Sequence, residues 1–130
     1  KKSINMKIHL NLKRRWFDMI QSGAKREEYR EIKDHWARRV LQWKSEQEYM
    51  DYCEMLTDMR DPLRRHRSVG ELLTYFDVQI KQFGTIIFSN GYASDAPRFQ
   101  HACYGVTIAK GREDWGADPE KYYFVFKLSQ

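Results

Sequence analysis

The sequence predicts an α+β fold in which about five or six strands form a small β-barrel with helices packed against it. Polar and apolar residues alternate over residues 6–12, 98–109 and 121–128, which is the pattern of a strand with one buried face. Residues 84–89 form a short apolar run, typical of a buried strand. The chain has 130 residues, 42% of them hydrophobic, enough for one core, so we expect a single domain over residues 6–130.

Two helices are predicted in the N-terminal part of the chain. Large apolar residues recur at helical spacing over residues 13–22, and Gly23 stands where a left-handed C-cap would end this helix. Asp34 is suited to begin a second helix, and the apolar residues on its inner face are Trp36, Val40 and Leu41. This helix either breaks near residue 45 or continues to about residue 59.

Residues 45–82 are predicted to form a helical insertion packed against the barrel. Asp61 and Pro62 indicate a turn, and the spacing of Ser68 and Glu71 is that of a capping box at the start of another helix. Residues 1–5 precede the predicted domain, and we expect them to be disordered or not part of the natural chain.

Charge and hydropathy favour a cytoplasmic protein with an anionic partner. The 23 Lys and Arg residues against 18 Asp and Glu leave a net charge of +5, a modest excess compared with a nucleic-acid-binding tail. No apolar stretch approaches the ~20 residues that cross a bilayer, and the N-terminus lacks the apolar core of a signal peptide. We therefore expect no membrane partner, while the oligomeric state stays open.

The sequence indicates neither a metal site nor a cofactor. Cys53 and Cys103 are far apart, and we expect reduced thiols rather than a disulfide. The four histidines show no ligand spacing to one another or to a cysteine: His9, His35, His66 and His101. A Gly-rich phosphate loop and a serine-hydrolase motif are also missing, so nucleotide hydrolysis through a P-loop and serine-hydrolase chemistry have no support.

Three charged residues that follow the first helix are candidate ligand-binding residues. Glu28 and Arg30 are two residues apart, so on a strand both side chains point to one face, and Lys25 in the preceding turn can reach the same side. An arginine offers a planar fork to a phosphate or a base edge, and a carboxylate accepts hydrogen bonds from base amino groups. The alternative is a solvated ion-pair ladder of little energetic value.

Two residues after the apolar run 84–89 complete the candidate site. The side-chain amide of Asn90 carries both donors and an acceptor, as base recognition requires. The ring of Tyr92 lies in a loop beside a glycine, where it can stack on a nucleobase. Two basic clusters, Lys13–Arg15 and Arg64–Arg67, suit either phosphate contacts or solvated surface.

Several short motifs occur in the order found in one family of domains. They are Leu10-Asn11-Leu12, Trp16-Phe17, Gly23-Ala24-Lys25, Glu27-Glu28-Tyr29-Arg30, Phe88-Ser89-Asn90-Gly91-Tyr92, Pro97-Arg98-Phe99 and Trp115-Gly116-Ala117. In these motifs the chain resembles the ASCH domain family of the PUA-like superfamily of β-barrels. The resemblance covers roughly residues 6–44 and 83–128. Its most specific element is the G-x-K-x-x-E-x-R spacing of Gly23, Lys25, Glu28 and Arg30.

The resemblance implies binding of RNA, of single-stranded nucleic acid or of a modified nucleoside in a cationic cleft. The ligand-binding residues would be Lys25, Glu28, Arg30, Asn90 and Tyr92. The alternative that it implies is a small hydrolase acting on RNA or, like some similar proteins, on N4-acetylcytidine. Lys25 and Glu28 would then be the catalytic residues.

One departure from the amidohydrolase pattern bears on this alternative. The pattern has a threonine, the proposed nucleophile, three positions after the lysine, and here that position is Glu28. Thr85 or Ser89 would have to supply the hydroxyl instead. Glu28 as a general base on water would be weak, because neighbouring cations keep a carboxylate ionised. The sequence therefore favours a binding module and leaves open whether the protein is an enzyme.

Overall fold

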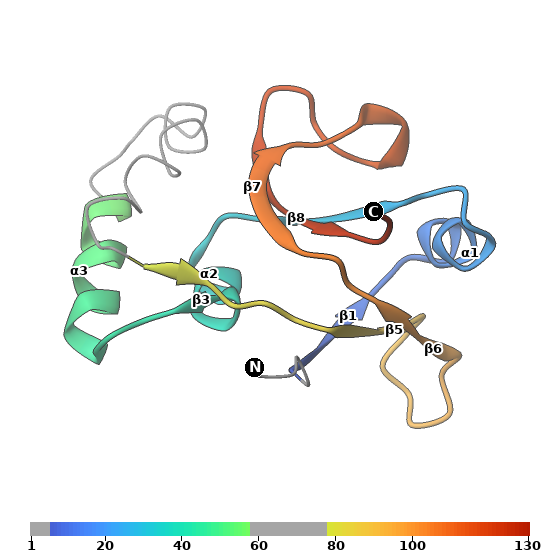
Figure 1. Cartoon of the computed structure of the whole chain (residues 1–130), viewed down its shortest axis with the longest axis horizontal. Coiled ribbons are helices and arrows are strands. Elements are labelled where there is room, and N and C mark those ends of the chain that lie inside the picture. Colours follow the sequence, from blue (N-terminus) through green and yellow to red (C-terminus); the bar gives the residue numbers. More distant parts are fainter. Residues whose placement is uncertain (1–5, 58–77) are drawn as a thin grey trace. The chain divides into compact units, whose positions relative to one another are not determined.

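A computed structural model of the chain describes residues 6–57 and 78–130. Over these residues the fold is α+β, with three α-helices, one short 3-10 helix and eight strands (Figure 1). The chain divides into two compact units: unit 1 comprises Lys1–Glu28, Gln82–Val106 and Phe126–Gln130, and unit 2 comprises Tyr29–Lys81 and Thr107–Val125. No helix within the described ranges is long and apolar enough to cross a membrane.

Unit 1 is built on a three-stranded sheet of order β1-β5-β6. Strand β1 (Lys7–Asn11) runs parallel to β5 (Thr85–Ser89), and β5 runs antiparallel to β6 (Arg98–Ala102). Buried residues alternate with more exposed ones along β1 and β5, and the buried ones are Ile8, Leu10, Ile86 and Phe88. The strands predicted within residues 6–12 and 84–89 are therefore confirmed.

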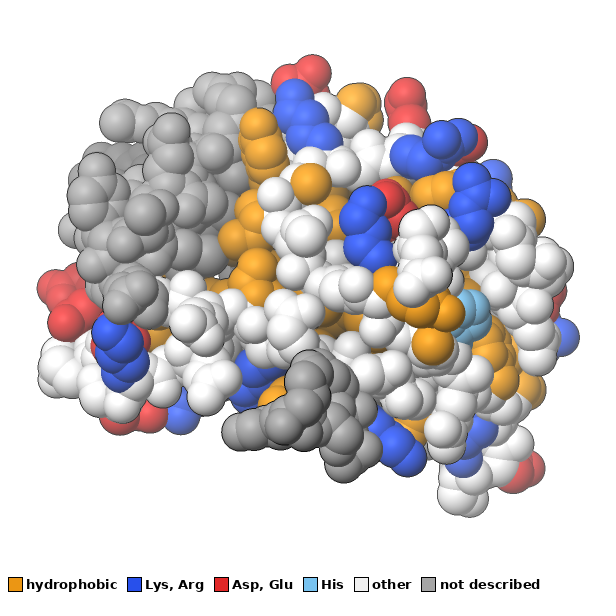
Figure 2. Space-filling model, viewed as in Figure 1, with side chains coloured by type: hydrophobic (Ala, Val, Ile, Leu, Met, Phe, Trp, Pro, Cys, Tyr) orange, Lys and Arg blue, Asp and Glu red, His pale blue; other side chains and the backbone are white. Residues whose placement is uncertain are grey.

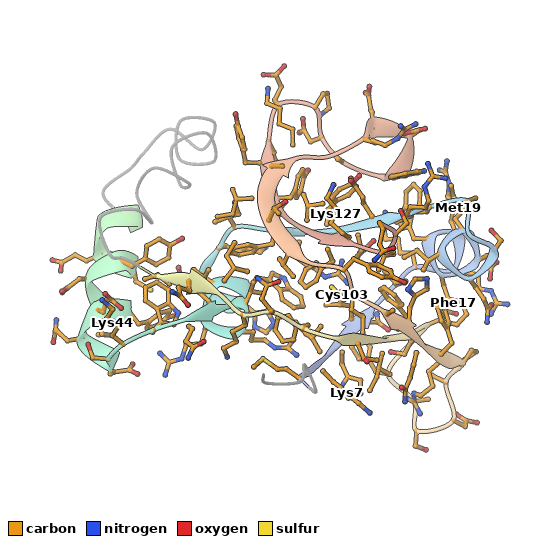
Figure 3. All side chains as sticks on the ribbon, in the orientation of Figure 1. Lys7, Phe17, Met19, Lys44, Cys103 and Lys127 are labelled. Carbon is orange, nitrogen blue, oxygen red and sulfur yellow. The ribbon has the colours of Figure 1, made fainter. Side chains whose placement is uncertain are left out.

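Helix α1 (Arg14–Ser22) packs against this sheet through aromatic side chains. Phe17 meets Phe99 of β6 edge-to-face, with ring centroids 4.9 Å apart, and Phe99 in turn lies 5.4 Å from Phe88. Figure 3 shows Phe17 between α1 and β6. Each such ring pair adds about 0.5–1.5 kcal/mol beyond the apolar area that it buries. The predicted helix over residues 13–22 is confirmed, including its end at Gly23.

Unit 2 contains the larger part of a second sheet, of order β2-β8-β7. The strands of this sheet are β2 (Glu27–Glu31), β7 (Val106–Lys110) and β8 (Tyr122–Lys127). The other elements of unit 2 are α2 (Asp34–Val40), β3 (Leu41–Gln42), α3 (Glu46–Thr57), β4 (Gln79–Ile80) and the 3-10 helix η1 (Glu113–Trp115). Its core includes Tyr29, Ile32, Val40, Leu41, Trp115, Tyr123 and Phe124.

The predicted β-barrel is wrong. In a barrel the ladder of hydrogen bonds continues until the last strand pairs with the first, whereas the strands of the described residues form three separate sheets. The segment 98–109 was predicted as one strand, but it consists of β6, which pairs with β5, and β7, which belongs to the other three-stranded sheet. Between them Gly105 adopts φ +142°, a conformation that favours glycine, and the chain leaves the first sheet there.

The predicted insertion over residues 45–82 is described only in part. Helix α2 ends at Val40 and α3 begins at Glu46, so the second helix breaks, which was one of the two predicted alternatives. Residues 79–80, predicted within a helix, instead form β4, which pairs antiparallel with β3. The predicted turn at residues 61–62, the basic cluster at 64–67 and the predictions for residues 1–5 lie outside the described residues. A single domain over residues 6–130 stays a prediction.

Candidate functional site

Lys25 is positioned by the end of helix α1. Gly23 adopts φ +88°, and its N–H donates to Ile20 O at 3.1 Å, which closes the helix. The chain then folds back, and the N–H of Lys25 donates to Met19 O at 2.9 Å. Met19 O is one of the last four carbonyls of the helix, which have no donor within the helix itself. This hydrogen bond therefore fixes Lys25 beside the last turn of α1.

Lys25 and Glu28 form a buried ion pair in unit 1. Nζ of Lys25 lies 3.1 Å from Oε1 of Glu28, and the two side chains are 1% and 7% exposed. Removing either charge from water costs several kcal/mol, so each group depends on the other for compensation. The burial of both side chains excludes the solvated ladder that was one reading of the sequence.

The indole of Trp16 lies beside both a buried and an exposed cation. Nζ of Lys25 is 5.2 Å from the ring centroid, and Cζ of Arg15 is 4.6 Å from it. Both distances fall within the ~6 Å over which a ring quadrupole attracts a cation. The sequence analysis counted Trp16 only among the large apolar residues at helical spacing over residues 13–22. Its part in holding Lys25 was missed because Lys25 lies outside the helix.

Arg30 is found in unit 2, on the same strand as Glu28. Its Nη1 donates to Tyr29 O at 2.8 Å, and its Cζ lies 5.2 Å from the ring centroid of Trp36. Trp36 was predicted only as an apolar residue of α2. The structure thus brings Lys25 and Glu28 into contact and associates Arg30 with Trp36, a partner that the sequence did not indicate.

Asn90 holds a loop against the end of strand β1. Its side-chain Nδ2 donates to Leu12 O at 2.9 Å, and its own N–H donates to Pro97 O at 2.9 Å across the base of the loop. The neighbouring Gly91 N–H donates to Oδ1 of Asn11 at 2.8 Å. The side-chain amide of Asn90, predicted to bind a base, is therefore engaged in positioning the β5–β6 loop.

Tyr92 and the basic start of α1 lie next in the chain to the residues that form these hydrogen bonds. Tyr92 is 90% exposed, more than any other large apolar residue of the described part of the chain. Lys13 follows Leu12, whose N–H donates to Ser89 O at 2.8 Å. Tyr92 directly follows Gly91, and Lys13 directly follows Leu12. The Cα atoms of Tyr92 and Lys13 therefore each lie about 3.8 Å from the Cα atom of a residue that takes part in these hydrogen bonds. We call Lys13, Arg14, Arg15 and Tyr92 the α1–loop surface.

The charges of the α1–loop surface are only partly compensated. Arg14 pairs with Asp18 at 3.2 Å, and both side chains are more than half exposed. Lys13 and Arg15 are exposed and form no ion pair with a carboxylate within the part of the chain that the structure describes. The first turn of α1 contains no acidic residue, so the partial positive charge of the helix N-terminus adds to these cations.

Cationic side chains form no single continuous patch among the described residues on the face drawn in Figure 2. On the face drawn in Figure 2, Lys and Arg side chains occur among acidic and apolar ones. No group of His, Cys, Asp and Glu residues in the described ranges could hold a metal ion, and neither Cys53 nor Cys103 forms a disulfide. The contacts of individual residues therefore locate the site better than the overall charge does.

Comparisons with models of known protein families, with curated proteins and with solved structures found no match to this chain. Membership of the ASCH family stays a prediction that rests on the residues of its motifs.

Proposed function

We propose that unit 1 binds single-stranded RNA through the α1–loop surface. The observation that carries this proposal is the exposure of Tyr92, which is 90%. The hydrogen bonds of Asn90 and Gly91 hold the start of its loop against Leu12 and Asn11, and the basic start of α1 directly follows Leu12 in the chain. Binding of a single strand requires one contact to a base and one to the backbone. The exposed ring can supply the first, and two cations without a carboxylate partner in the described residues can supply the second.

The ring supplies the base contact. Stacking of a nucleobase on an aromatic side chain contributes about 1–3 kcal/mol per base and tolerates any sequence. The loop that presents Tyr92 is closed at its base by Asn90 N–H to Pro97 O, and Arg98 Nη1 donates to Ser94 O within it at 3.1 Å. A loop fixed by its own hydrogen bonds loses little conformational entropy when a base stacks on its ring.

The basic start of α1 supplies the phosphate contacts. Lys13 offers a compact charge and Arg15 a planar guanidinium fork. The guanidinium of Arg15 lies 4.6 Å from the centroid of the Trp16 ring, which restricts its conformations before a phosphate arrives. Anions are also favoured at a helix N-terminus by the backbone N–H groups and the helix dipole.

A single strand fits this surface better than a duplex. Bases in an A-form duplex are stacked on one another and are not available to a protein ring, whereas loops and single strands can splay a base out. A free modified nucleoside would use the ring alone and would leave the cations without a partner. The polymer is therefore the preferred ligand.

Calorimetric titration with single-stranded RNA, duplex RNA and free nucleosides at two salt concentrations tests the proposal. We expect tighter binding of the single strand than of the duplex, with log K falling by ~0.7 per phosphate contact for each tenfold increase in salt. Equal affinity for duplex and single strand would contradict a role for base stacking. Salt-independent binding of a free nucleoside alone would contradict the phosphate contacts.

A further inference from the structure

Strand β6 forms one edge of the sheet in unit 1. The sheet order is β1-β5-β6, so β6 pairs with β5 on one side and with no other strand of the described residues on its second side. None of the five residues of β6 is buried, and Arg98, Gln100 and Ala102 are exposed. A row of backbone N–H and C=O groups along an open edge is a template for pairing with a further strand.

The ladder between β5 and β6 shows which backbone groups of β6 face outward. At one end of this ladder the N–H of Cys103 donates to Gly84 O at 3.0 Å. Hydrogen-bonded pairs alternate with non-hydrogen-bonded pairs along antiparallel strands, so every second residue, counted from the neighbour of Cys103, directs its N–H and C=O away from β5. These residues, which we call the β6 edge, are Ala102, Gln100 and Arg98.

The backbone of the β6 edge is available to a partner strand. Its N–H groups have no hydrogen-bond partner in the part of the chain that the structure describes. Nδ1 of His101 lies 2.7 Å from Ala102 O, and a carbonyl oxygen has a second lone pair for another donor. The guanidinium of Arg98 donates to Ser94 O of the preceding loop at 3.1 Å, so the one charged side chain of the β6 edge is held at its end.

We propose that two copies of this chain pair through the β6 edge, with their β6 strands antiparallel about a two-fold axis at Gln100. Gln100 then lies opposite Gln100 of the second copy, and Arg98 of each copy lies opposite Ala102 of the other. In this register every outward N–H of one copy meets an outward C=O of the other. A register shifted by two residues would leave the groups at one end of each strand without a partner.

The β6 edge is complementary to itself, which favours a second copy of this chain as the partner. The two Arg98 residues lie at opposite ends of the paired strands, about 14 Å apart along the strand direction. This separation exceeds the Debye length of about 8 Å at physiological salt, so their repulsion is largely screened. Opposite each arginine lies the small side chain of Ala102. Because both copies use the same strand, the association stops at two chains.

The variant Gln100→Pro removes a hydrogen bond of the proposed pairing and none of the ladder to β5. Proline has no N–H, and the N–H of Gln100 faces away from β5. Proline is accepted in edge strands at positions whose N–H side faces solvent. The matched control is Gln100→Ala, which shortens the same side chain and keeps the N–H. Thermal unfolding followed by circular dichroism checks that both variants are folded.

Sedimentation of the full chain measures its mean mass at protein concentrations up to about 1 mM. We expect the mean mass of the wild type to rise from 15.7 kDa toward twice that value as the concentration increases. The dimer dissociation constant of Gln100→Pro should exceed that of Gln100→Ala at least about tenfold, because the hydrogen bonds at the two-fold axis are lost. A wild type that remains at 15.7 kDa would overturn the inference, and so would equal dissociation constants of the two variants.

Two charged variants test the same pairing if Gln100→Pro does not fold. Gln100→Lys and Gln100→Glu change the net charge in opposite directions, but each places two like charges directly opposite each other at the two-fold axis. We expect both to raise the dimer dissociation constant about two- to fivefold. Opposite effects of the two variants, or no effect of either, would contradict the pairing. These measurements contain no RNA, so their outcome does not depend on the proposed function.

Discussion

The ammonium group of Lys25 lies 3.1 Å from the carboxylate of Glu28, and both side chains are almost completely buried. The pair links the turn after α1 to the start of strand β2, and the indole of Trp16 lies 5.2 Å from the same ammonium. Residues that a motif suggested as ligand contacts are thus paired with each other in the interior of unit 1.

We expect removal of one partner of this pair to destabilise the protein strongly. Lys25→Ala or Glu28→Ala leaves a buried charge without its compensating partner, and the free energy of unfolding should fall by about 3–5 kcal/mol. The double variant Lys25→Met/Glu28→Leu should be closer to wild type, because no charge is then buried. Urea denaturation measures all three variants.

Arg38→Ala is the control for this prediction, because its ion pair with Glu46 is exposed to solvent and should contribute little to the free energy of unfolding. A loss in Lys25→Ala no larger than in Arg38→Ala would show that the Lys25–Glu28 pair does not stabilise the fold.

Local structure could be predicted where a short pattern determines it. The alternation of Ile8, Leu10 and Leu12 and the positive φ required at Gly23 are properties of a few neighbouring residues, and both were recognised correctly. The pairing of the strands could not be predicted correctly. Alternation shows that one face of a strand is buried, but it does not show which strand is the neighbour. The chain changes from one sheet to the other near Gly105, within a segment whose alternation predicted one strand.

The surroundings of the candidate site residues could be predicted only in part. The spacing of Lys25 and Glu28 predicted that their side chains lie on the same side. Whether such a pair is exposed depends on the residues packed around it, and these include Trp16 of helix α1. Asn90 has the donors and acceptor of a base-recognition residue, yet its amide is engaged by Leu12 O. Nothing in the sequence near Asn90 indicates that contact, since the two residues are far apart in the chain.

We expect the exposed cations at the start of α1 to contribute to RNA affinity through phosphate contacts. Lys13→Ala and Arg15→Ala should each reduce the slope of log K against log salt by ~0.7. Lys7→Ala is the matched control: Lys7 is exposed in the same unit, at the opposite end of β1 (Figure 3). Equal slopes for all three variants would show that only net charge matters.

Tyr49 should titrate at unusually high pH. The hydrogen bond between Tyr49 and Cys53, together with partial burial, raises the pKa of Tyr49 to about 12 from the usual 10.0. A folded-state pKa above the unfolded value stabilises the fold fully below pH 10, and this contribution is lost as the pH rises toward 12. Ultraviolet difference spectra should contain a late tyrosinate step that disappears in Tyr49→Phe and shifts to lower pH in Cys53→Ala. A late step that persists in Tyr49→Phe would assign it to another tyrosine.

The pure protein should release little cytidine from N4-acetylcytidine. Glu28 occupies the position where the amidohydrolase pattern has a threonine nucleophile, and its carboxylate is buried against Lys25. A substrate carbonyl would have to displace that pair to reach either group. Chromatography of the incubated nucleoside measures the release. Rapid turnover that is lost in a folded Glu28→Gln variant would establish a hydrolase.

The exposed ring of Tyr92 is the centre of the proposed RNA-binding surface, and a comparison with Tyr104 tests it most directly. Tyr104 lies in the same unit and is 51% exposed. Tyr92 precedes strand β6 and Tyr104 follows it, and a strand of five residues such as β6 spans about 17 Å. The measurement is the dissociation constant for a single-stranded oligoribonucleotide at one salt concentration. We expect Tyr92→Ala to raise it roughly fivefold to a hundredfold, the loss of one stacked base, and Tyr104→Ala to leave it within about twofold. Equal dissociation constants for the two variants would contradict the proposed function.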